Sequence, residues 1–274
     1  MGSDGRYDLP AGRLEERLEE KYAAYTDAEA KAEADRCLYC YDAPCMHACP
    51  THIDIPTFIK KISTGNLAGS AKTILEANLL GASCSRVCPV EVLCEGECVY
   101  TGWGRKPIEI GRLQRHAMDH AASPDLLEKS ASTGKSIALV GAGPASLACA
   151  GTLALLGHTP VIYEKGNLPG GLNTTGVAPY KMDARTALAE VEFIRSLGVR
   201  IQTGTEIGGT LSAQELLKTH EAVFLGPGLG ADSALGVPGE EGPGVLGAVE
   251  WIAAMKTKPR TTVKSIRSAE GSDG

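Results

Sequence analysis

All but one of the nine cysteines fall into two short groups whose spacing is typical of metal chemistry. The first group, in "CLYCYDAPCMHACP", consists of Cys37, Cys40, Cys45 and Cys49. The second, in "CSRVCPVEVLCEGEC", consists of Cys84, Cys88, Cys94 and Cys98. Both contain C-x3-C-P, as in the iron–sulfur run whose first three cysteines hold one cluster while the fourth binds its neighbour. We therefore predict two 4Fe-4S clusters, and from spacing alone all eight cysteines are candidate ligands.

Two other uses of clustered cysteines fit less well. Zinc sites usually take two C-x2-4-C pairs a dozen or more residues apart, whereas each group here is in tight succession. Disulfides are rare in a reducing cytosol, and the N-terminus "MGSDGRYDLP" has no apolar signal-peptide core behind it. A cytoplasmic location is therefore expected. Cys149 stands alone in an apolar helical pattern and is interpreted as a buried small hydrophobe.

The chain around the cysteine groups is predicted to be helical. "TDAEAKAEADRC" opens with a capping box of Thr26 and Glu29 and leads into the first cysteine. Further helices are expected over 54–65, 66–81 and 107–122, and nothing in residues 1–125 alternates like a strand. We predict a multidomain chain in which residues 1–130 form an all-α, ferredoxin-like domain that holds both clusters. "SPDLLEKSASTGK" is expected to be a linker.

A dinucleotide-binding pattern begins at residue 136. "SIALVGAGPASLACAGTLALLGHTPVIYEKG" is a strand, a glycine turn, a helix and a second strand that ends in an acid. Gly141 permits the turn, Gly143 lets the backbone approach a pyrophosphate at the helix N-terminus, and Ser146 replaces the third Gly or Ala. Glu164 follows about 20 residues later, where an acid can accept from a ribose hydroxyl. We predict a partial α/β Rossmann-like domain over residues 135–256, and an empty Rossmann-like unit is the structural alternative.

The charge of the chain argues against two classes of partner, nucleic acids and anionic membranes. There are 27 basic and 33 acidic residues and no polybasic block, so nucleic acid and anionic membranes are not expected partners. There is also no run of about 18 apolar residues, which a membrane-spanning helix needs. No Ser/His/Asp or paired-carboxylate arrangement stands out among the scattered histidines, so we predict no catalytic residue in this chain.

Taken together, the two cysteine groups, "GAGPAS", "YEKGNLPGGL" and "EAVFLGPGL" resemble the flavin and NAD(P)H subunit of dihydropyrimidine dehydrogenase. The wider group includes the glutamate synthase small subunit. The resemblance covers roughly residues 25–256. "GGLNTTGVAPYK" and "FLGPGLGADSALGVPGEE" favour the dihydropyrimidine dehydrogenase branch.

The resemblance implies a definite set of cluster ligands. One cluster would be held by Cys37, Cys40, Cys45 and Cys98. The other would be held by Cys49, Cys88, Cys94 and the side chain of Gln114, which leaves Cys84 without a cluster. An oxygen ligand in place of a thiolate would alter the charge and potential of that cluster. Whether Cys84 or Gln114 is the last ligand stays open on the residues alone.

The resemblance also implies FAD and its contacts. These would come from the turn Ala142, Gly143, Pro144, Ala145 and Ser146, and from Glu164, Lys165, Gly171, Leu172, Lys181 and Ile207. The second Gly-Gly turn, in "LPGGLNTTG", is a feature that flavin domains often have and nicotinamide domains usually lack.

The last residues are expected to be a disordered tail over 257–274. The family would continue into a nicotinamide domain, and this sequence stops where that domain would begin. We therefore expect either a truncated fragment or a short form completed by a partner chain, with NAD(P)H bound outside this chain.

The expected function is electron transfer within an NAD(P)H-dependent oxidoreductase. Electrons would pass from FAD through the two 4Fe-4S clusters to a second catalytic subunit, in a hetero-oligomer that reduces uracil or thymine to the dihydropyrimidine. The cofactors supply the chemistry and the protein their placement. Two alternatives stand: a subunit like the glutamate synthase small subunit, and a non-enzymatic iron–sulfur electron-transfer or assembly module.

Overall fold

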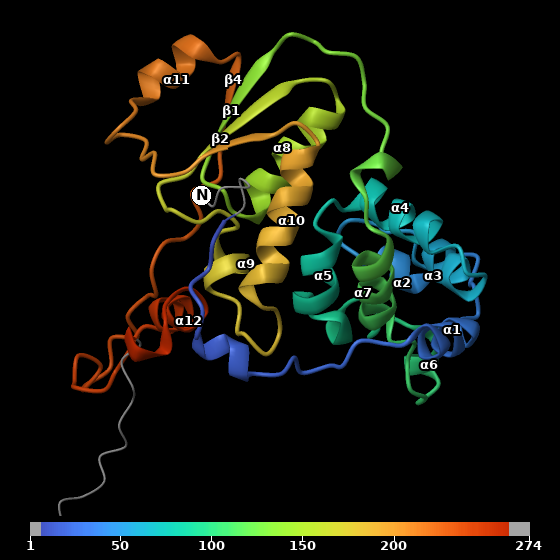
Figure 1. Ribbon diagram of the computed structural model, residues 1–274. Helices are drawn as coiled ribbons and strands as arrows, with labels where there is room; N and C mark the ends of the chain where they lie inside the picture. The colour runs from blue at the N-terminus through green and yellow to red at the C-terminus, as the bar shows by residue number, and fades with distance from the viewer. Residues whose placement is uncertain (1–6, 263–274) are drawn as a thin grey trace, which may run out of the picture.

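A computed structural model describes residues 7–262, which form a helical N-terminal half followed by a small parallel sheet flanked by helices (Figure 1). The helical half contains α1 (Asp27–Asp35), α2 (Pro44–His47), α3 (Ile55–Ser63), α4 (Leu67–Ala77), α5 (Gly81–Val87), α6 (Val99–Gly102) and α7 (Ile110–Ala121). The second half contains β1 (Ser136–Val140), α8 (Pro144–Leu155), β2 (Thr159–Tyr163), α9 (Leu172–Thr175), α10 (Ala184–Ser196), β3 (Arg200–Gln202), α11 (Ala213–Thr219), β4 (Ala222–Leu225) and α12 (Ala248–Thr257). This order confirms the predicted succession of a helical domain and a Rossmann-like one.

The helices of the first half begin where local chemistry starts them. Thr26 and Glu29 form the predicted capping box at α1, and the Asp54 side chain accepts from the Thr57 amide at the start of α3. Such caps satisfy amide groups that the first helical turn leaves without partners. The helices pack around a core that includes Phe58, Ile59 and two of the cysteines, Cys49 and Cys94. The cysteine-bearing segments are therefore held by one apolar core.

The sheet of the second half has the strand order β3-β2-β1-β4, and all its pairings are parallel. Helices α8 and α10 cover one face, where Leu139, Ile162 and Ile194 are fully buried. Helix α11 covers the other face through Leu216. The strand order reverses between β1 and β4, and ligands of such sheets bind at the carboxyl ends of the strands at that reversal. The glycine turn that follows β1 lies at this place.

The two halves share an interface between α5 and α10 (Figure 1). Leu79 and Leu80, just before α5, belong to the apolar cluster beneath α8 and α10. The predicted linker is also anchored, because the amides of Ser130 and Thr133 donate to the carbonyls of Leu155 and Gly157. These contacts fix α5, which carries Cys84, against the Rossmann-like half.

The end of the chain differs from the expected tail. Thr257 closes α12, Pro259 bridges to Arg13, and a 3-10 helix follows over Arg260–Thr262. Regular structure therefore continues through residue 262, because α12 packs against α9 and the N-terminal segment. The rest of the predicted tail, 263–274, lies outside the described residues. Of the helices in the described part of the chain, none has both the length and the apolar character that crossing a membrane requires.

Candidate cofactor sites

Cys37, Cys40, Cys45 and Cys98 line one cavity, here called the first cysteine pocket. Cys37 follows the end of α1, Cys45 lies in α2, and Cys98 is the residue before α6. The remaining wall is mostly apolar and includes Ile59 and Ile108. The structure thus brings together the four cysteines that the resemblance implies for one cluster.

Four thiols in an apolar pocket fit a metal cluster. Burial, and after it the neighbouring Cys37 and Cys98, raise the pKa of Cys45 to about 12. No Lys or Arg is among the described residues that line this pocket. Several thiolates can therefore coexist here only with a bound cation, since metal binding and thiol deprotonation are coupled.

A second cavity, the second cysteine pocket, collects five candidate donors. They are Cys49, Cys84, Cys88, Cys94 and Gln114. The Nε2 of Gln114 donates to the Gly81 carbonyl at 2.9 Å, so its Oε1 is the atom that can serve as a ligand. A side-chain hydrogen bond from Cys88 lowers the pKa of Cys84 to about 7. Both Cys84 and Gln114 therefore lie where a last ligand would lie.

The two pockets adjoin each other. Ile55 and Ile110 line both of them, so a single layer of side chains separates the cavities. Cys49 lines the second pocket and comes soon after Cys45, which lines the first. This is expected of a cysteine run whose fourth member binds the neighbouring cluster. Two clusters held here would be neighbours.

The glycine turn after β1 has the geometry of a dinucleotide cradle. Gly141 has φ +86°, and a Cβ on it would lie 2.5 Å from the Gly226 carbonyl oxygen. A Cβ on Gly143 would meet nothing within 4 Å, so the space at the N-terminus of α8 is open. Such open space over helix amides suits a pyrophosphate. Ser146 is fully buried, and its Oγ has no hydrogen-bond partner in the described structure.

The second Gly-Gly turn lies against the first, as the resemblance implies. The Gly170 amide donates to the Ala142 carbonyl at 2.8 Å. A Cβ on Gly171 would lie 2.8 Å from the Cα of Gly143, so only glycine allows this approach. Pro144 and Ala145 open α8, and Leu172 opens α9 and is half exposed. The two turns therefore form one continuous backbone surface.

The remaining predicted contacts are more dispersed. The carboxylate of Glu164 accepts from the amides of Ala142 and Gly166, both at 2.7 Å, which leaves lone pairs for a ribose hydroxyl. Lys165 is exposed beside it. Ile207 packs with Tyr163 and Leu216 on the sheet face that α11 covers. Lys181 lines a separate cavity that also includes Cys88 and Arg86, rather than the glycine turn.

Sequence reasoning missed Glu190, Ser83 and Asn173, which connect the two halves. Glu190 lies on the same face of α10 as the buried Ala187, Val191 and Ile194. An acid on the apolar face of an amphipathic helix was the signal that could have revealed it. Burial raises the pKa of Glu190, while hydrogen bonds from Ser83 and Ala82 oppose that shift.

Comparison with known proteins agrees with this geometry. Residues 14–126 match the family described as dihydropyrimidine dehydrogenase domain II, 4Fe-4S cluster, and residues 139–188 match the NAD(P)-binding Rossmann-like domain. The NAD-dependent dihydropyrimidine dehydrogenase subunit PreT of Escherichia coli K12 is 40% identical over 80% of this chain and 53% of its own length. The glutamate synthase [NADPH] small chain of Halomonas elongata is 35% identical over 91% of this chain and 54% of its own length. The chain thus spans about half the length of these relatives.

Proposed function

We propose that this chain, whose residues 14–126 match the family described as dihydropyrimidine dehydrogenase domain II, 4Fe-4S cluster, is the electron-transfer part of an NAD(P)H-dependent oxidoreductase. The two cysteine pockets would hold 4Fe-4S clusters and the glycine turns would hold FAD, and these groups would supply electron transfer to a catalytic partner subunit. The observation that carries this proposal is the division of the eight grouped thiols between two adjoining pockets. Adjoining cluster sites suit single-electron transfer, whereas a lone structural metal site needs no neighbour.

The Rossmann-like half supports a flavin as the source of electrons. The doubled glycine surface around Gly143 and Gly171 leaves open space at the start of α8. A flavin supplies the conversion of a two-electron hydride donor into single electrons. The protein's part is to hold that group next to the clusters, and the Asn173 side chain reaches from the second turn to Ser83 in the helical half at 2.9 Å.

For the partner reaction we propose reduction of uracil or thymine to the dihydropyrimidine. PreT, which is named as a dihydropyrimidine dehydrogenase subunit, is 40% identical to this chain, and two glutamate synthase small chains are 34–35% identical. The second candidate is a glutamate synthase small chain, which one observation favours: that match extends over 258 residues against 220. Co-expression with each kind of catalytic subunit, followed by NAD(P)H oxidation assays with uracil or with glutamine and 2-oxoglutarate, separates the two.

The central test is the content of iron, sulfide and flavin per chain after anaerobic purification. About eight irons, the sum for two cubanes, with FAD bound would support the whole proposal. The same iron without FAD would favour the non-enzymatic iron–sulfur module. One or two zincs and no iron would overturn the assignment of both pockets.

A further inference from the structure

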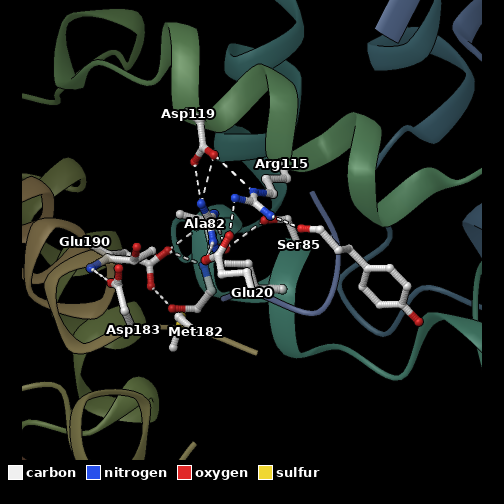
Figure 2. Close-up of polar contacts among 12 residues, drawn as sticks. Glu20, Ala82, Ser85, Arg115, Asp119, Met182, Asp183 and Glu190 are labelled. Atoms are coloured by element: carbon white, nitrogen blue, oxygen red, sulfur yellow. Dashed lines mark hydrogen bonds and ion pairs between the residues drawn. The ribbon is translucent and has the colours of Figure 1, made fainter. Parts of the chain in front are cut away.

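Glu190 of α10 is a carboxyl group buried between the two halves of the molecule. Only 7% of the surface of Glu190 is exposed to solvent. Its Oε1 accepts from the amides of Ala82 and Ser83, both at 3.0 Å, and its Oε2 accepts from the Ser83 hydroxyl. Figure 2 shows the Glu190 side chain reaching from α10 to Ala82 in the first turn of α5. The amides that open α5 are therefore satisfied by a residue more than a hundred positions away.

The first turn of α5 leads into the second cysteine pocket. Cys84, which directly follows Ser83, lines that pocket, and so does Cys88, the residue that follows α5. The Gly81 carbonyl, in the same turn, accepts from Gln114 of α7 at 2.9 Å. Any displacement of this turn would move Cys84 and the Gln114 amide together.

The same turn also touches the dinucleotide-binding half. The Nδ2 of Asn173 in α9 donates to the Ser83 hydroxyl oxygen at 2.9 Å. Because Ser83 donates onward to Glu190, the hydroxyl joins α9 and α10 to α5. Gly171, which packs on Gly143 of the first glycine turn, lies just before α9. One hydroxyl thus links the proposed flavin cradle to the second cysteine pocket.

The far end of α5 is held separately. Arg86 pairs with Asp119 at 2.8 Å and with Glu20 at 3.4 Å, and Arg115 pairs with the same two acids (Figure 2). This ion-pair network anchors α5 within the helical half alone. Contact with the other half is made by the first turn of α5 and by Leu79 and Leu80 just before it.

We propose that Glu190 is a positioning residue that fixes the first turn of α5, and with it the ligand set of the second cluster, beside the α9 turn. This inference rests on the proposed function, because it presumes a cluster in the second cysteine pocket. It assigns Glu190 no direct contact with either cofactor. A carboxylate suits the role because its two oxygens accept all three donors.

The test compares the reduced clusters of anaerobically purified variants by electron paramagnetic resonance and redox titration. The signal that a Cys88→Ser change removes identifies the second cluster. Glu190→Gln keeps the length of the side chain but replaces the oxygen that accepts from the Ser83 hydroxyl with an NH2 donor, and Glu190→Asp keeps the charge but shortens the reach. We expect both to retain iron and to shift the line shape and midpoint potential of the second cluster, with the first cluster unchanged.

Glu192→Gln is the matched control, because Glu192 lies on the same helix and its carboxylate pairs with Arg195, one turn along α10, at 2.8 Å. It should leave both signals as in the wild type. Ser83→Ala removes the shared hydroxyl and should shift the second-cluster signal in the same way, which keeps the test decisive if the Glu190 variants do not fold.

A wild-type signal and potential for the second cluster in Glu190→Gln and Ser83→Ala would overturn the inference while leaving the proposed function intact. Equal changes in both clusters would also overturn it, because they would show general loosening rather than positioning. Wild-type protein without any cluster signal would overturn the proposed function itself.

Discussion

At the scale of single residues, the second cysteine pocket poses the sharpest question, because it holds one donor more than a cubane needs. Gln114 is 5% exposed, and its amide nitrogen is occupied by the Gly81 carbonyl. Its oxygen is therefore oriented without any metal. Cys84, by contrast, gains its hydrogen bonds from the neighbouring Cys88 and Gln114. We propose the assignment that the resemblance implies, with Gln114 as the ligand and Cys84 as a thiol beside the cluster.

Replacement of the two cysteines tests that preference. Cys84→Ser should retain about eight irons per chain, since the cluster keeps its four donors. The iron content of Cys88→Ser should fall to about four per chain, because this change removes a ligand of one cubane only. Iron analysis of the anaerobically purified variants makes the measurement. A loss of iron in Cys84→Ser equal to that in Cys88→Ser would instead make Cys84 the ligand.

A second residue-scale prediction concerns Gly141. Gly141→Ala should lower the free energy of unfolding by about 1–2 kcal/mol through its left-handed backbone alone, and further through the contact of a Cβ with the Gly226 carbonyl. Urea unfolding measures the change. Gly134→Ala is the control, because Gly134 also has positive φ but a Cβ there meets nothing within 4 Å. Equal losses in the two variants would show that the close approach to Gly226 has no energetic effect.

At the scale of elements, His220 joins three parts of the Rossmann-like half. It follows α11, and its ring nitrogens lie 2.8 Å from the Ser136 hydroxyl of β1 and 3.0 Å from the Tyr163 hydroxyl of β2. Burial, and then the charge of Arg200, lower the pKa of His220 below its ordinary 6.5. The folded protein therefore holds this imidazole neutral where the unfolded chain would protonate it.

The sign of the resulting pH dependence follows from linkage. Between about pH 7 and pH 5 the unfolded state binds the extra proton first, so the free energy of unfolding should fall as the pH is lowered. His220→Gln should reduce this slope, measured by urea unfolding at a series of pH values. His158→Gln is the control, since that histidine is also half-buried but bonds the Thr133 hydroxyl instead. An unchanged slope in His220→Gln would contradict the assignment.

At the scale of the whole molecule, a buried lysine attaches helix α12 to the rest of the chain. Lys256 of α12 is fully buried, and its Nζ donates to the carbonyls of Asn173, Val177 and Met182 at 3.0–3.1 Å. Burial lowers the pKa of Lys256 to about 8, against the attraction of Glu15 and Asp183. The ammonium stays charged at neutral pH and satisfies three carbonyls of the segment that includes α9.

Lys256→Met should therefore cost about 1–3 kcal/mol of stability, since it leaves buried carbonyls without donors. It should also raise hydrogen exchange in residues 173–182, which the lysine holds. Mass-spectrometric hydrogen exchange and urea unfolding measure the two effects. Lys258→Met, two residues on at an exposed position, is the control and should change neither. If hydrogen exchange in residues 173–182 is the same in Lys256→Met as in the wild type, the proposed attachment is contradicted.

Local patterns in the sequence determined much of this protein. The capping box at Thr26 and the strand–turn–helix around Gly141 depend on contacts between residues close in the chain, so spacing alone could predict them. The run of the first cysteine group likewise predicted that Cys49 would serve the neighbouring site, whereas the placement of Cys98 with Cys37, Cys40 and Cys45 was implied only by the resemblance.

Only the tertiary structure decided the contacts between distant segments. Cys84 and Gln114 face one cavity, Glu190 closes the first turn of α5, and Lys256 holds the α9 segment. Each of these contacts depends on how α5, α7, α10 and α12 pack. The sequence around a charged residue in a helix does not indicate which distant residue that charge will contact. The sequence could therefore predict the parts of the electron path, whereas the packing of helices determined how those parts are held together.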